Sequence, residues 1–294
     1  MNKARIFVVA GATGRVGGAA AKHLRVAGHK VVGITHNTSK VQKLESMGVV
    51  PLVADLRDPS TLIAHLREID GFFLVTDPFA RRKETDDVDV WVEDEVRQGE
   101  QALEAAKAAG VPHVVQCSVT HLGSDAALEK YGLPVHKTKM TIERHARELG
   151  LAHTALRPPW FMDDWIPNPI FPTPWLESGR IEMSLKADTP LPQIATDDIG
   201  RIAAWAFNHP DESIGQAWEI VGEVTTLPAI ARTLSEHFHR PIVFSEVSET
   251  EDNFPPNRAL VQHEYTWEVG RWEVKFGFKM TTLDEFVRLA LPPA

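Results

Sequence analysis

The chain of 294 residues has a single cysteine, Cys117, and no apolar stretch of membrane-spanning length. A membrane span needs roughly 20 consecutive apolar residues. One cysteine cannot form an internal disulfide or a four-cysteine zinc site, and no other metal site is expected. The first apolar run, Ile6–Ala10, is too short for the core of a secretory signal. These absences predict a soluble, cytoplasmic protein without a membrane partner.

Positive charge and tyrosine are also scarce. The sequence has 31 Lys and Arg against 40 Asp and Glu, which gives a formal net charge of −9, and its two tyrosines are Tyr131 and Tyr265. General nucleic-acid binding needs a basic face, so no nucleic-acid partner is expected. The excess of acidic residues does not exclude a small basic pocket that binds a phosphate.

Short apolar, β-branched runs alternate with helical segments up to Arg157. Such alternation is typical of an α/β fold with a doubly wound parallel sheet, and we assign it to residues 1–157. The expected strands are Ile6–Ala10, Lys30–Thr35, Val49–Ala54, Asp70–Thr76, Val114–Ser118 and His153–Leu156. The expected helices are Ala19–Ala27, Ser39–Met47, Pro59–Leu66, Val90–Ala109 and Lys137–Leu149.

The amino-acid composition and the pattern of predicted elements change after Arg157. Residues 158–192 contain eight prolines, which predicts an irregular excursion rather than a simple connector. Further helices and strands follow, and Thr282–Glu285 is a capping box that opens a last helix. We therefore expect residues 158–294 to form a smaller, mixed α/β part that binds substrate and packs against the first domain.

A glycine-rich segment, Gly11-Ala-Thr-Gly14-Arg-Val-Gly17, follows the first strand and opens a helix. In this context Gly11 allows a tight turn, Gly14 lets the backbone approach a pyrophosphate, and Gly17 permits close helix–strand packing. We predict that the phosphates of a dinucleotide bind at Gly11, Thr13, Gly14, Arg15, Val16 and Gly17. The alternative is a glycine-rich turn that packs a helix without any ligand.

The end of the second strand lacks an acidic residue. An Asp or Glu there would bind the ribose 2′-hydroxyl and favour NAD, but the sequence reads Thr35-His36-Asn37-Thr38-Ser39-Lys40. Arg15, His36 and Lys40 could instead surround a 2′-phosphate, so NADP(H) is favoured over NAD(H) as the cofactor. The alternative is that His36 and Lys40 are ordinary solvated residues.

Further cofactor candidates follow the later strands. Asp55 could accept a hydrogen bond from the adenine amino group, with Leu56 beside it, and it could also cap the helix at Pro59, for which Asp58 and Ser60 are further candidates. Thr76 and Ser118 follow the fourth and fifth strands, at the carboxyl edge where ligands bind. Ser118 could touch the nicotinamide or simply bridge its loop.

Several segments recur here together and in the same order as in a known family. They are GATGRVGG, Ala54-Asp55-Leu56, Phe73-Leu74-Val75-Thr76, Lys139 with Glu143, and Leu156-Arg157-Pro158 with Trp160-Phe161-Met162. Over its first 165 residues the chain resembles the NmrA-like group of atypical short-chain dehydrogenases/reductases. The resemblance implies a Rossmann fold that binds NADP(H). It also implies a divided family, which includes reductases of quinones, dyes and other aromatic compounds, and non-catalytic sensors of the nicotinamide redox state.

The proton-donating tyrosine of typical short-chain dehydrogenases is missing. In a Tyr-x-x-x-Lys pattern ending at Lys139 the tyrosine position is Val135, which disfavours tyrosine-based carbonyl reduction and sugar-nucleotide epimerisation. The resemblance assigns Lys139 to the nicotinamide ribose; the alternative is an exposed lysine paired with Glu143. His136 lies on the same helix face and could donate a proton, or it is an ordinary polar histidine.

Aromatic side chains fall in loops at or after strand ends. A flat apolar substrate could be lined by Phe79, His121, Trp160, Phe161 and Trp165, although large aromatics also fill cores. The acidic run from Asp86 to Glu95 is interpreted as a solvated helix face, and Cys117 as inert packing.

Taken together, the sequence predicts an NADP(H)-dependent reductase. Hydride would pass to an apolar, aromatic or quinone-like small molecule without a catalytic tyrosine. The alternative is a non-catalytic NADPH/NADP sensor that regulates a protein partner.

Overall fold

The chain forms two compact units, and the backbone passes from one unit to the other several times. The computed structural model describes residues 4–77, 84–121, 126, 129, 134–166, 175–248 and 267–290. Unit 1 lies within residues 1–119, 134–157 and 199–219, and unit 2 within residues 120–133, 158–198 and 220–294. The chain thus leaves unit 1 after Arg157, where the sequence predicts a boundary, and returns to it for residues 199–219.

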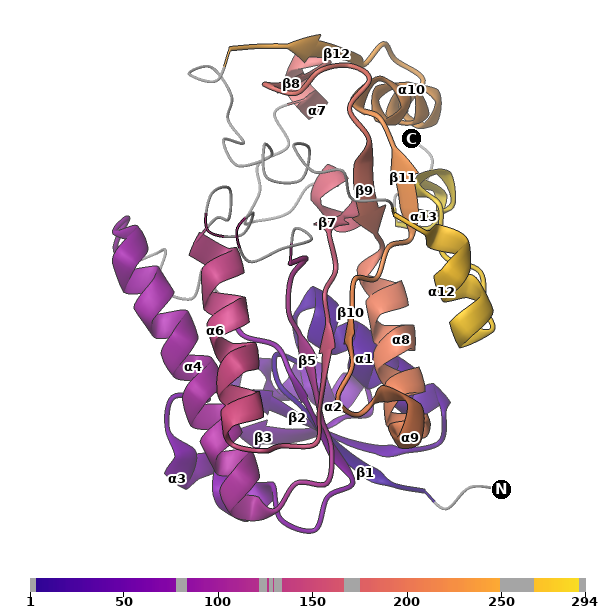
Figure 1. The fold of residues 1–294 in the computed structure, drawn as a ribbon. Coiled ribbons are helices and arrows are strands. Elements are labelled where there is room, and N and C mark those ends of the chain that lie inside the picture. Colours follow the sequence, from indigo (N-terminus) through magenta and orange to yellow (C-terminus); the bar gives the residue numbers. More distant parts are fainter. Residues whose placement is uncertain are drawn as a thin grey trace. The chain divides into compact units, whose positions relative to one another are not determined.

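Unit 1 is built on a seven-stranded sheet in the order β10-β6-β5-β4-β1-β2-β3 (Figure 1). The strands are β1 Ile6–Val9, β2 Lys30–Thr35, β3 Val50–Val53, β4 Gly71–Leu74, β5 Val114–Cys117, β6 His153–Leu156 and β10 Ala217–Trp218. Every neighbouring pair is parallel. Residues of β4, β5 and β6 are buried throughout, as expected for strands covered on both faces. The doubly wound parallel sheet is confirmed.

Helices cover both faces of this sheet. They are α1 Arg15–Val26, α2 Val41–Ser46, α3 Pro59–Leu62, α4 Val88–Ala109, α6 Pro134–Glu148, α8 Thr196–Asn208 and α9 Pro210–Ser213. Val8 packs in one cluster with residues of α4 and α6, which lie side by side (Figure 1). The neighbouring Phe7 stacks on Phe207 of α8 at a ring distance of 4.7 Å. Successive strand residues point to opposite faces, so α8 and the α4–α6 pair lie on different sides.

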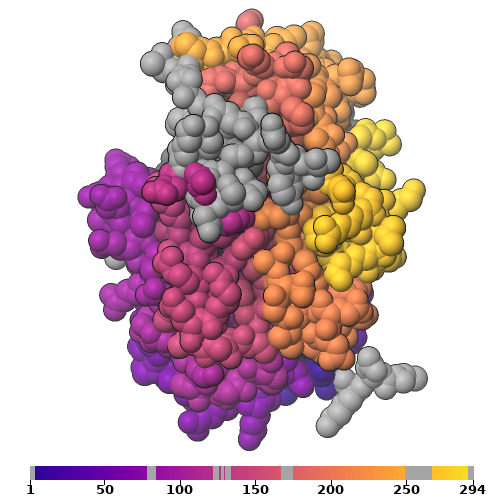
Figure 2. Space-filling view, in the orientation of Figure 1, coloured from indigo at the N-terminus to yellow at the C-terminus, as the bar shows by residue number. Residues whose placement is uncertain are grey.

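A glycine allows α8 to pack against α1. A Cβ atom on Gly200 would lie 2.4 Å from the backbone carbon of Ala19, so only glycine fits this crossing. The outer side of α6 faces solvent and carries the exposed residues Lys137, Arg144 and Arg147 (Figure 2). Its inner side is buried, and it supplies part of the site described below.

Two predicted helices of unit 1 are wrong as single elements. Ser39–Met47 begins within a 3-10 turn over Thr38–Lys40 and continues as α2, Val41–Ser46. The segment Pro59–Leu66 is the short helix α3, which ends at Leu62, followed by a 3-10 turn over Ile63–His65. Its first turn is capped by Asp58, whose side chain accepts from the Ser60 N–H at 3.0 Å. The helix α1 begins at Arg15, four residues before the predicted start, so it opens directly from the glycine turn.

Unit 2 is a smaller mixture of strands and helices. Three strands form one sheet, β7 Trp160–Phe161, β9 Leu191–Ile194 and β11 Glu223–Thr225, and β8 Arg180–Met183 pairs in parallel with β12 Val243–Glu246. The helices are α7 Trp175–Ser178, α10 Leu227–Phe238, α12 Val269–Phe276 and α13 Leu283–Ala290. They enclose a cluster of buried residues that includes Trp165, Ile230, Leu234 and Val287. The mixed α/β character predicted for this part is confirmed.

The capping box at the start of α13 is also confirmed. The Thr282 N–H donates to Glu285 Oε2 at 3.0 Å, and the Glu285 N–H donates back to Thr282 Oγ1 at 3.3 Å. The backbone hydrogen bond from Thr282 lowers the pKa of Glu285. None of the helices in the described ranges is long and apolar enough to cross a membrane.

Candidate functional site

The glycine turn between β1 and α1 has a geometry that only glycine satisfies. Gly11 has a φ of +58°, and its carbonyl oxygen accepts from the Gly14 N–H at 2.8 Å. A Cβ atom on Gly17 would lie 2.4 Å from the Gly11 oxygen and 2.5 Å from the Ala10 oxygen. The first turn of α1 therefore sits directly against the end of β1.

This turn fits a dinucleotide pyrophosphate. Gly14 is the N-cap of α1 and brings no side chain over the helix end, and a Cβ there would lie 3.2 Å from the Gly11 oxygen. Arg15 and Val16 begin the helix, whose N-terminus carries partial positive charge from its backbone N–H groups. An open, glycine-lined helix end at the carboxyl edge of a parallel sheet is the usual place for phosphate groups.

Gly17→Ala is expected to weaken nucleotide binding by about tenfold or more, because the new methyl group must displace the Gly11 and Ala10 carbonyls. Calorimetric titration with NADPH measures this loss. Gly270→Ala is the control, since a Cβ atom there meets nothing within 4 Å. Equal NADPH affinity in the Gly17 variant and the parent would contradict a tight glycine turn.

The end of β2 carries no acid, as the sequence indicates. Thr35 Oγ1 accepts from the Asn37 N–H at 3.1 Å, and Asn37 caps the following 3-10 turn, Thr38–Lys40. His36 and Lys40 are both exposed.

A lysine that the sequence analysis missed reaches the glycine turn. Lys43 Nζ donates to the Thr13 carbonyl oxygen at 2.9 Å. The sequence indicated Lys43 only by its position, three residues after Lys40 and one helical turn further along the same segment. The positive charge beside the glycine turn therefore includes Lys43.

Asp55 is engaged by Arg57 at the end of β3. Asp55 Oδ1 accepts from Arg57 Nε at 2.9 Å, and Oδ2 accepts from Nη2 at 2.8 Å. The hydrogen bonds from Arg57 lower the pKa of Asp55, so it is a carboxylate. The alternative role of Asp55 as helix cap is wrong, because Asp58 is the cap of α3. Leu56 is half-buried and packs against the apolar core of unit 1.

Lys139 is buried in a polar cluster at the end of β4. Only 5% of the residue is exposed, and its Nζ lies 2.8 Å from Glu95 Oε1. It donates to Thr76 twice, to Oγ1 at 2.6 Å and to the carbonyl oxygen at 3.1 Å. The alternative of an exposed lysine paired with Glu143 is therefore wrong. Thr76, itself buried, donates from Oγ1 to Glu95 Oε1 at 2.9 Å.

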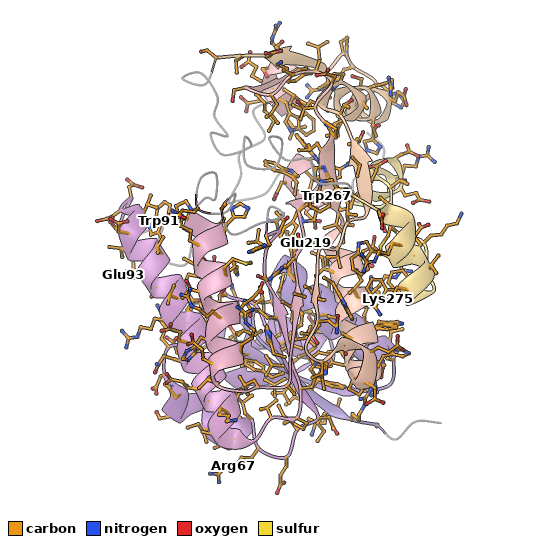
Figure 3. All side chains as sticks on the ribbon, in the orientation of Figure 1. Arg67, Trp91, Glu93, Glu219, Trp267 and Lys275 are labelled. Atoms are coloured by element: carbon orange, nitrogen blue, oxygen red, sulfur yellow. The ribbon has the colours of Figure 1, made fainter. Side chains whose placement is uncertain are left out.

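Glu95 is the functional candidate that sequence reasoning misjudged. It is only 1% exposed, so the prediction that the whole run from Asp86 to Glu95 is a solvated face is wrong at this residue. Glu93, by contrast, is exposed and lies on the outer side of α4 (Figure 3). The spacing of Glu95, Gln98 and Ala102, all buried, marks the inner face of α4 and was the available signal.

Glu143 lies one turn after Lys139 and serves a different set of partners. It accepts from the Ser118 hydroxyl at the end of β5, and from Arg157 Nη2 at 2.7 Å. Arg157 Nη1 also reaches Glu219, 3.3 Å away, a residue labelled in Figure 3. Although burial lowers it, the pKa of Arg157 is raised by its contacts with Glu143 and Glu219. Ser118 is thus held at the loop by Glu143.

Two other buried groups in unit 1 are uncharged at neutral pH. Burial lowers the pKa of His136 to about 4, so it is a neutral imidazole. Burial raises the pKa of the Cys117 thiol to about 11, which is consistent with inert packing.

A model of the NmrA-like family matches residues 2–263 of this sequence. The chain belongs to the NmrA-like family. The resemblance inferred from the first 165 residues is confirmed, and the match extends well into the second half of the chain.

Three relatives of this NmrA-like chain illustrate the range of the family fold. A curated relative, the NAD(P)H azoreductase of Xenophilus azovorans, is 25% identical over 244 residues, covering 83% of this chain and 77% of the relative. The structure of Citrobacter sp. triphenylmethane reductase complexed with NADP(H) has a TM-score of 0.76 and 21% identity, covering 98% of this chain and 100% of that chain. NmrA, a negative transcriptional regulator in complex with NADP, has a TM-score of 0.76 and 18% identity, covering 99% and 96%.

The substrate residues predicted for this NmrA-like chain fall in unit 2 where the structure describes them. Trp165 is buried in the core of that unit and donates from Nε1 to Gln193 Oε1 at 2.9 Å. Trp160 stacks on it at a ring distance of 5.6 Å. Phe161 and His121 are half-buried, and Phe79 lies outside the described residues. Trp165 thus has a packing role, and contact of these residues with a substrate stays a prediction.

Proposed function

We propose that this chain is an NADP(H)-dependent reductase whose acceptor is an apolar, aromatic or quinone-like molecule. The observation that carries the proposal is the set of residues at the carboxyl edge of the parallel sheet in unit 1. There, the glycine turn opens α1 after β1, and Lys139 is held at the end of the adjacent strand β4. When bound, the nicotinamide cofactor supplies the hydride. The NADP(H)-bound triphenylmethane reductase and the NAD(P)H azoreductase support a reductase that acts on aromatic compounds.

The cofactor residues have distinct tasks in this proposal. The pyrophosphate lies on the turn from Gly11 to Gly17, with its N–H groups as donors. Arg15, His36, Lys40 and Lys43 provide positive charge or donors for a 2′-phosphate. Asp55 and Leu56 border the adenine, while Thr76, Ser118 and Lys139 border the nicotinamide ribose.

The reaction is proposed to need no tyrosine acid. Val135 occupies the tyrosine position, so the acceptor either forms a stable phenolate or takes its proton from water or from His136. Because burial lowers the pKa of His136 to about 4, His136 is a neutral imidazole that could offer the acceptor only a hydrogen bond, which leaves water as the proton source. The candidates for contact with the acceptor are Phe79, His121, Trp160, Phe161 and Trp165.

A redox sensor is the second candidate function. It is favoured by the absent tyrosine and by the similar fold of NmrA, a transcriptional regulator that binds NADP. A sensor must bind NADPH and NADP⁺ with different affinities, or must bind its protein partner differently in each form.

Calorimetric titration of the protein with NADPH, NADP⁺, NADH and NAD⁺ tests the cofactor assignment. We expect micromolar NADPH affinity and NADH binding at least about tenfold weaker, because only NADPH carries the 2′-phosphate. Lys43→Ala should remove most of this difference, since Lys43 reaches the glycine turn. Lys30→Ala is the matched control, because Lys30 is the exposed first residue of β2, at the opposite end of the strand.

The same preparation then separates enzyme from sensor. Oxidation of NADPH in the presence of quinones, azo dyes or triphenylmethane dyes supports the reductase. Unequal affinity for NADPH and NADP⁺, with no acceptor consumed, supports the sensor. If none of the four nucleotides binds, both functions are excluded and the glycine turn is purely structural.

A further inference from the structure

One turn of α4 contacts three separate segments at the carboxyl edge of the sheet in unit 1. Asp94 Oδ1 lies 3.1 Å from Arg57 Nη1, and Arg57 in turn engages Asp55 after β3. Glu95 pairs with Lys139 of α6. These contacts place acidic side chains of α4 against cationic residues from two different elements.

Gln98, on the same turn, fixes the backbone after β4. Its Oε1 accepts from the Asp77 N–H at 3.1 Å, and its Nε2 donates to the Asp77 carbonyl oxygen at 3.2 Å. Nε2 also donates to Asp94 Oδ2 at 2.9 Å. Because Asp77 follows Thr76, this clamp holds the Thr76 oxygens that Lys139 contacts.

Each N–H donor of the Lys139 ammonium group has an acceptor among these neighbours. A lysine carries three N–H donors. Nζ contacts Glu95 Oε1, Thr76 Oγ1 and the Thr76 carbonyl oxygen. The second carboxylate oxygen of Glu95 accepts from the Thr138 hydroxyl, so Glu95 is fixed from both sides. Neither carboxylate nor ammonium can reorient without losing several hydrogen bonds.

We propose that Glu95 is a positioning residue for Lys139, which it holds against Thr76 at the carboxyl end of β4. The inference rests on the proposed function, because it gives Lys139 a fixed positive charge at the nucleotide end of the sheet. The pair is 1% and 7% exposed at its two side chains, so solvent screens it little.

The other charges near Lys139 do not replace Glu95. Glu143, on the next turn of α6, is engaged by Arg157. Cys117 on β5 is close enough for Lys139 to lower its pKa and for Glu95 to raise it, but burial keeps this thiol protonated, with a pKa of about 11. Glu95 is thus the carboxylate that contacts the Lys139 ammonium group among the described residues.

The first experiment needs no nucleotide. The folding equilibrium constants of Glu95→Gln, Lys139→Met and the double variant are measured by urea unfolding, with Glu93→Gln as the exposed control on the same helix. Each single substitution should lower the folding equilibrium constant by more than about 100-fold, because it leaves a buried charge without its partner. The double variant should recover at least about tenfold relative to additivity. Strictly additive losses would overturn the pairing.

The second experiment compares NADPH affinity and turnover of the parent with those of Glu95→Gln and Glu95→Asp. In Glu95→Gln the Lys139 ammonium group loses the carboxylate that holds it, so kcat/KM for NADPH should fall at least about tenfold. Glu95→Asp retains a carboxylate and should recover part of this loss. Parental kcat/KM in Glu95→Gln, or equal losses in the two variants, would make Glu95 merely structural and overturn the proposal.

Failure of the proposed function gives a different result. The parent protein would then bind none of the nucleotides, whereas the unfolding cycle would still report whether Glu95 and Lys139 are coupled. If the parent binds NADPH and the cycle shows no coupling, only the inference about Glu95 fails.

Discussion

Lowering the pH from about 6.5 to about 4 should remove most of the stability of unit 1, because three buried histidines bind protons only after unfolding. Burial lowers the pKa of His113, His136 and His153, each to about 4. For His113 the positive charge of Arg5, and that of His153 once it is protonated, add to this effect. Glu143 opposes it at His153 without cancelling the cost of burial.

Two of these rings donate from Nε2 to neutral oxygen acceptors, which would not compensate a second proton on the ring. Thr154 Oγ1 donates its own proton to the Ser213 carbonyl oxygen at 2.6 Å, so it accepts from His113 Nε2 at 2.9 Å. His153 Nε2 lies 3.0 Å from Gln116 Oε1, a neutral acceptor. A second proton on either ring would place a positive charge in the core beside neutral groups.

The sign of the effect follows from the two pKa values. Each group titrates near 6.5 when the chain is unfolded and near 4 in the fold. Between these values the unfolded state binds more protons, so stability is complete above about pH 6.5 and is lost as the pH falls through the window. A depression of this size corresponds to about 3 kcal/mol per histidine. Three such groups approach the total stability of an ordinary domain, about 5–15 kcal/mol.

Urea unfolding at a series of pH values measures this loss. The free energy of unfolding should fall with a slope that corresponds to as many as three protons near the middle of the window. His153→Gln should reduce the slope by about one proton. His36→Gln is the control, since His36 is exposed and should leave the slope unchanged. A stability that stays constant between about pH 6.5 and pH 5 would contradict buried, neutral histidines.

The backbone of unit 1 could be predicted because its signals are local. The strands Lys30–Thr35 and His153–Leu156 match the sequence prediction residue for residue, since turn-forming residues such as Gly28 and Pro158 lie just outside them. The glycine turn was equally clear, because Gly11 and Gly17 have a steric reason to be glycine that the motif spacing reveals.

The polar contacts of the site could not be predicted in the same way. Lys139 was identified, but its partner Glu95 lies 44 positions earlier, in a run whose composition suggested solvent exposure. Lys43 was passed over because its target is the Thr13 backbone, which carries no side-chain signal. Such pairings depend on which helices lie side by side, and only the folded sheet brings α4 and α6 together.

Glu143→Gln is expected to cost about 3–5 kcal/mol, the usual penalty for removing one partner of a buried ion pair. Glu143 is 1% exposed and accepts from Arg157 Nη2 at 2.7 Å and Nε at 3.1 Å. Its loss leaves Arg157 with Glu219 alone, 3.3 Å away. Glu219→Gln should cost less, about 1 kcal/mol, because it removes a single longer contact. Urea unfolding at about pH 7.5, above the histidine window, compares the two variants.

Arg157→Met combined with Glu143→Gln should recover part of the stability, because the guanidinium that Glu143 neutralised is then also gone. Equal costs for Glu143→Gln and Glu219→Gln would contradict the dominant role of Glu143.

A second double-variant cycle, Lys139→Met with Glu143→Gln, distinguishes the charge pairs of the structure from the Lys139–Glu143 pair that the sequence spacing suggests. Lys139 and Glu143 are four residues apart on α6 and would couple as an i,i+4 pair on an exposed helix. Here each charge has its own partner, Glu95 for Lys139 and Arg157 for Glu143, so their costs should add. The helix α6 then holds two independent charge pairs. Lys139 joins the helix to α4 through Glu95, while Glu143 joins it to the ends of β5 and β6 through Ser118 and Arg157.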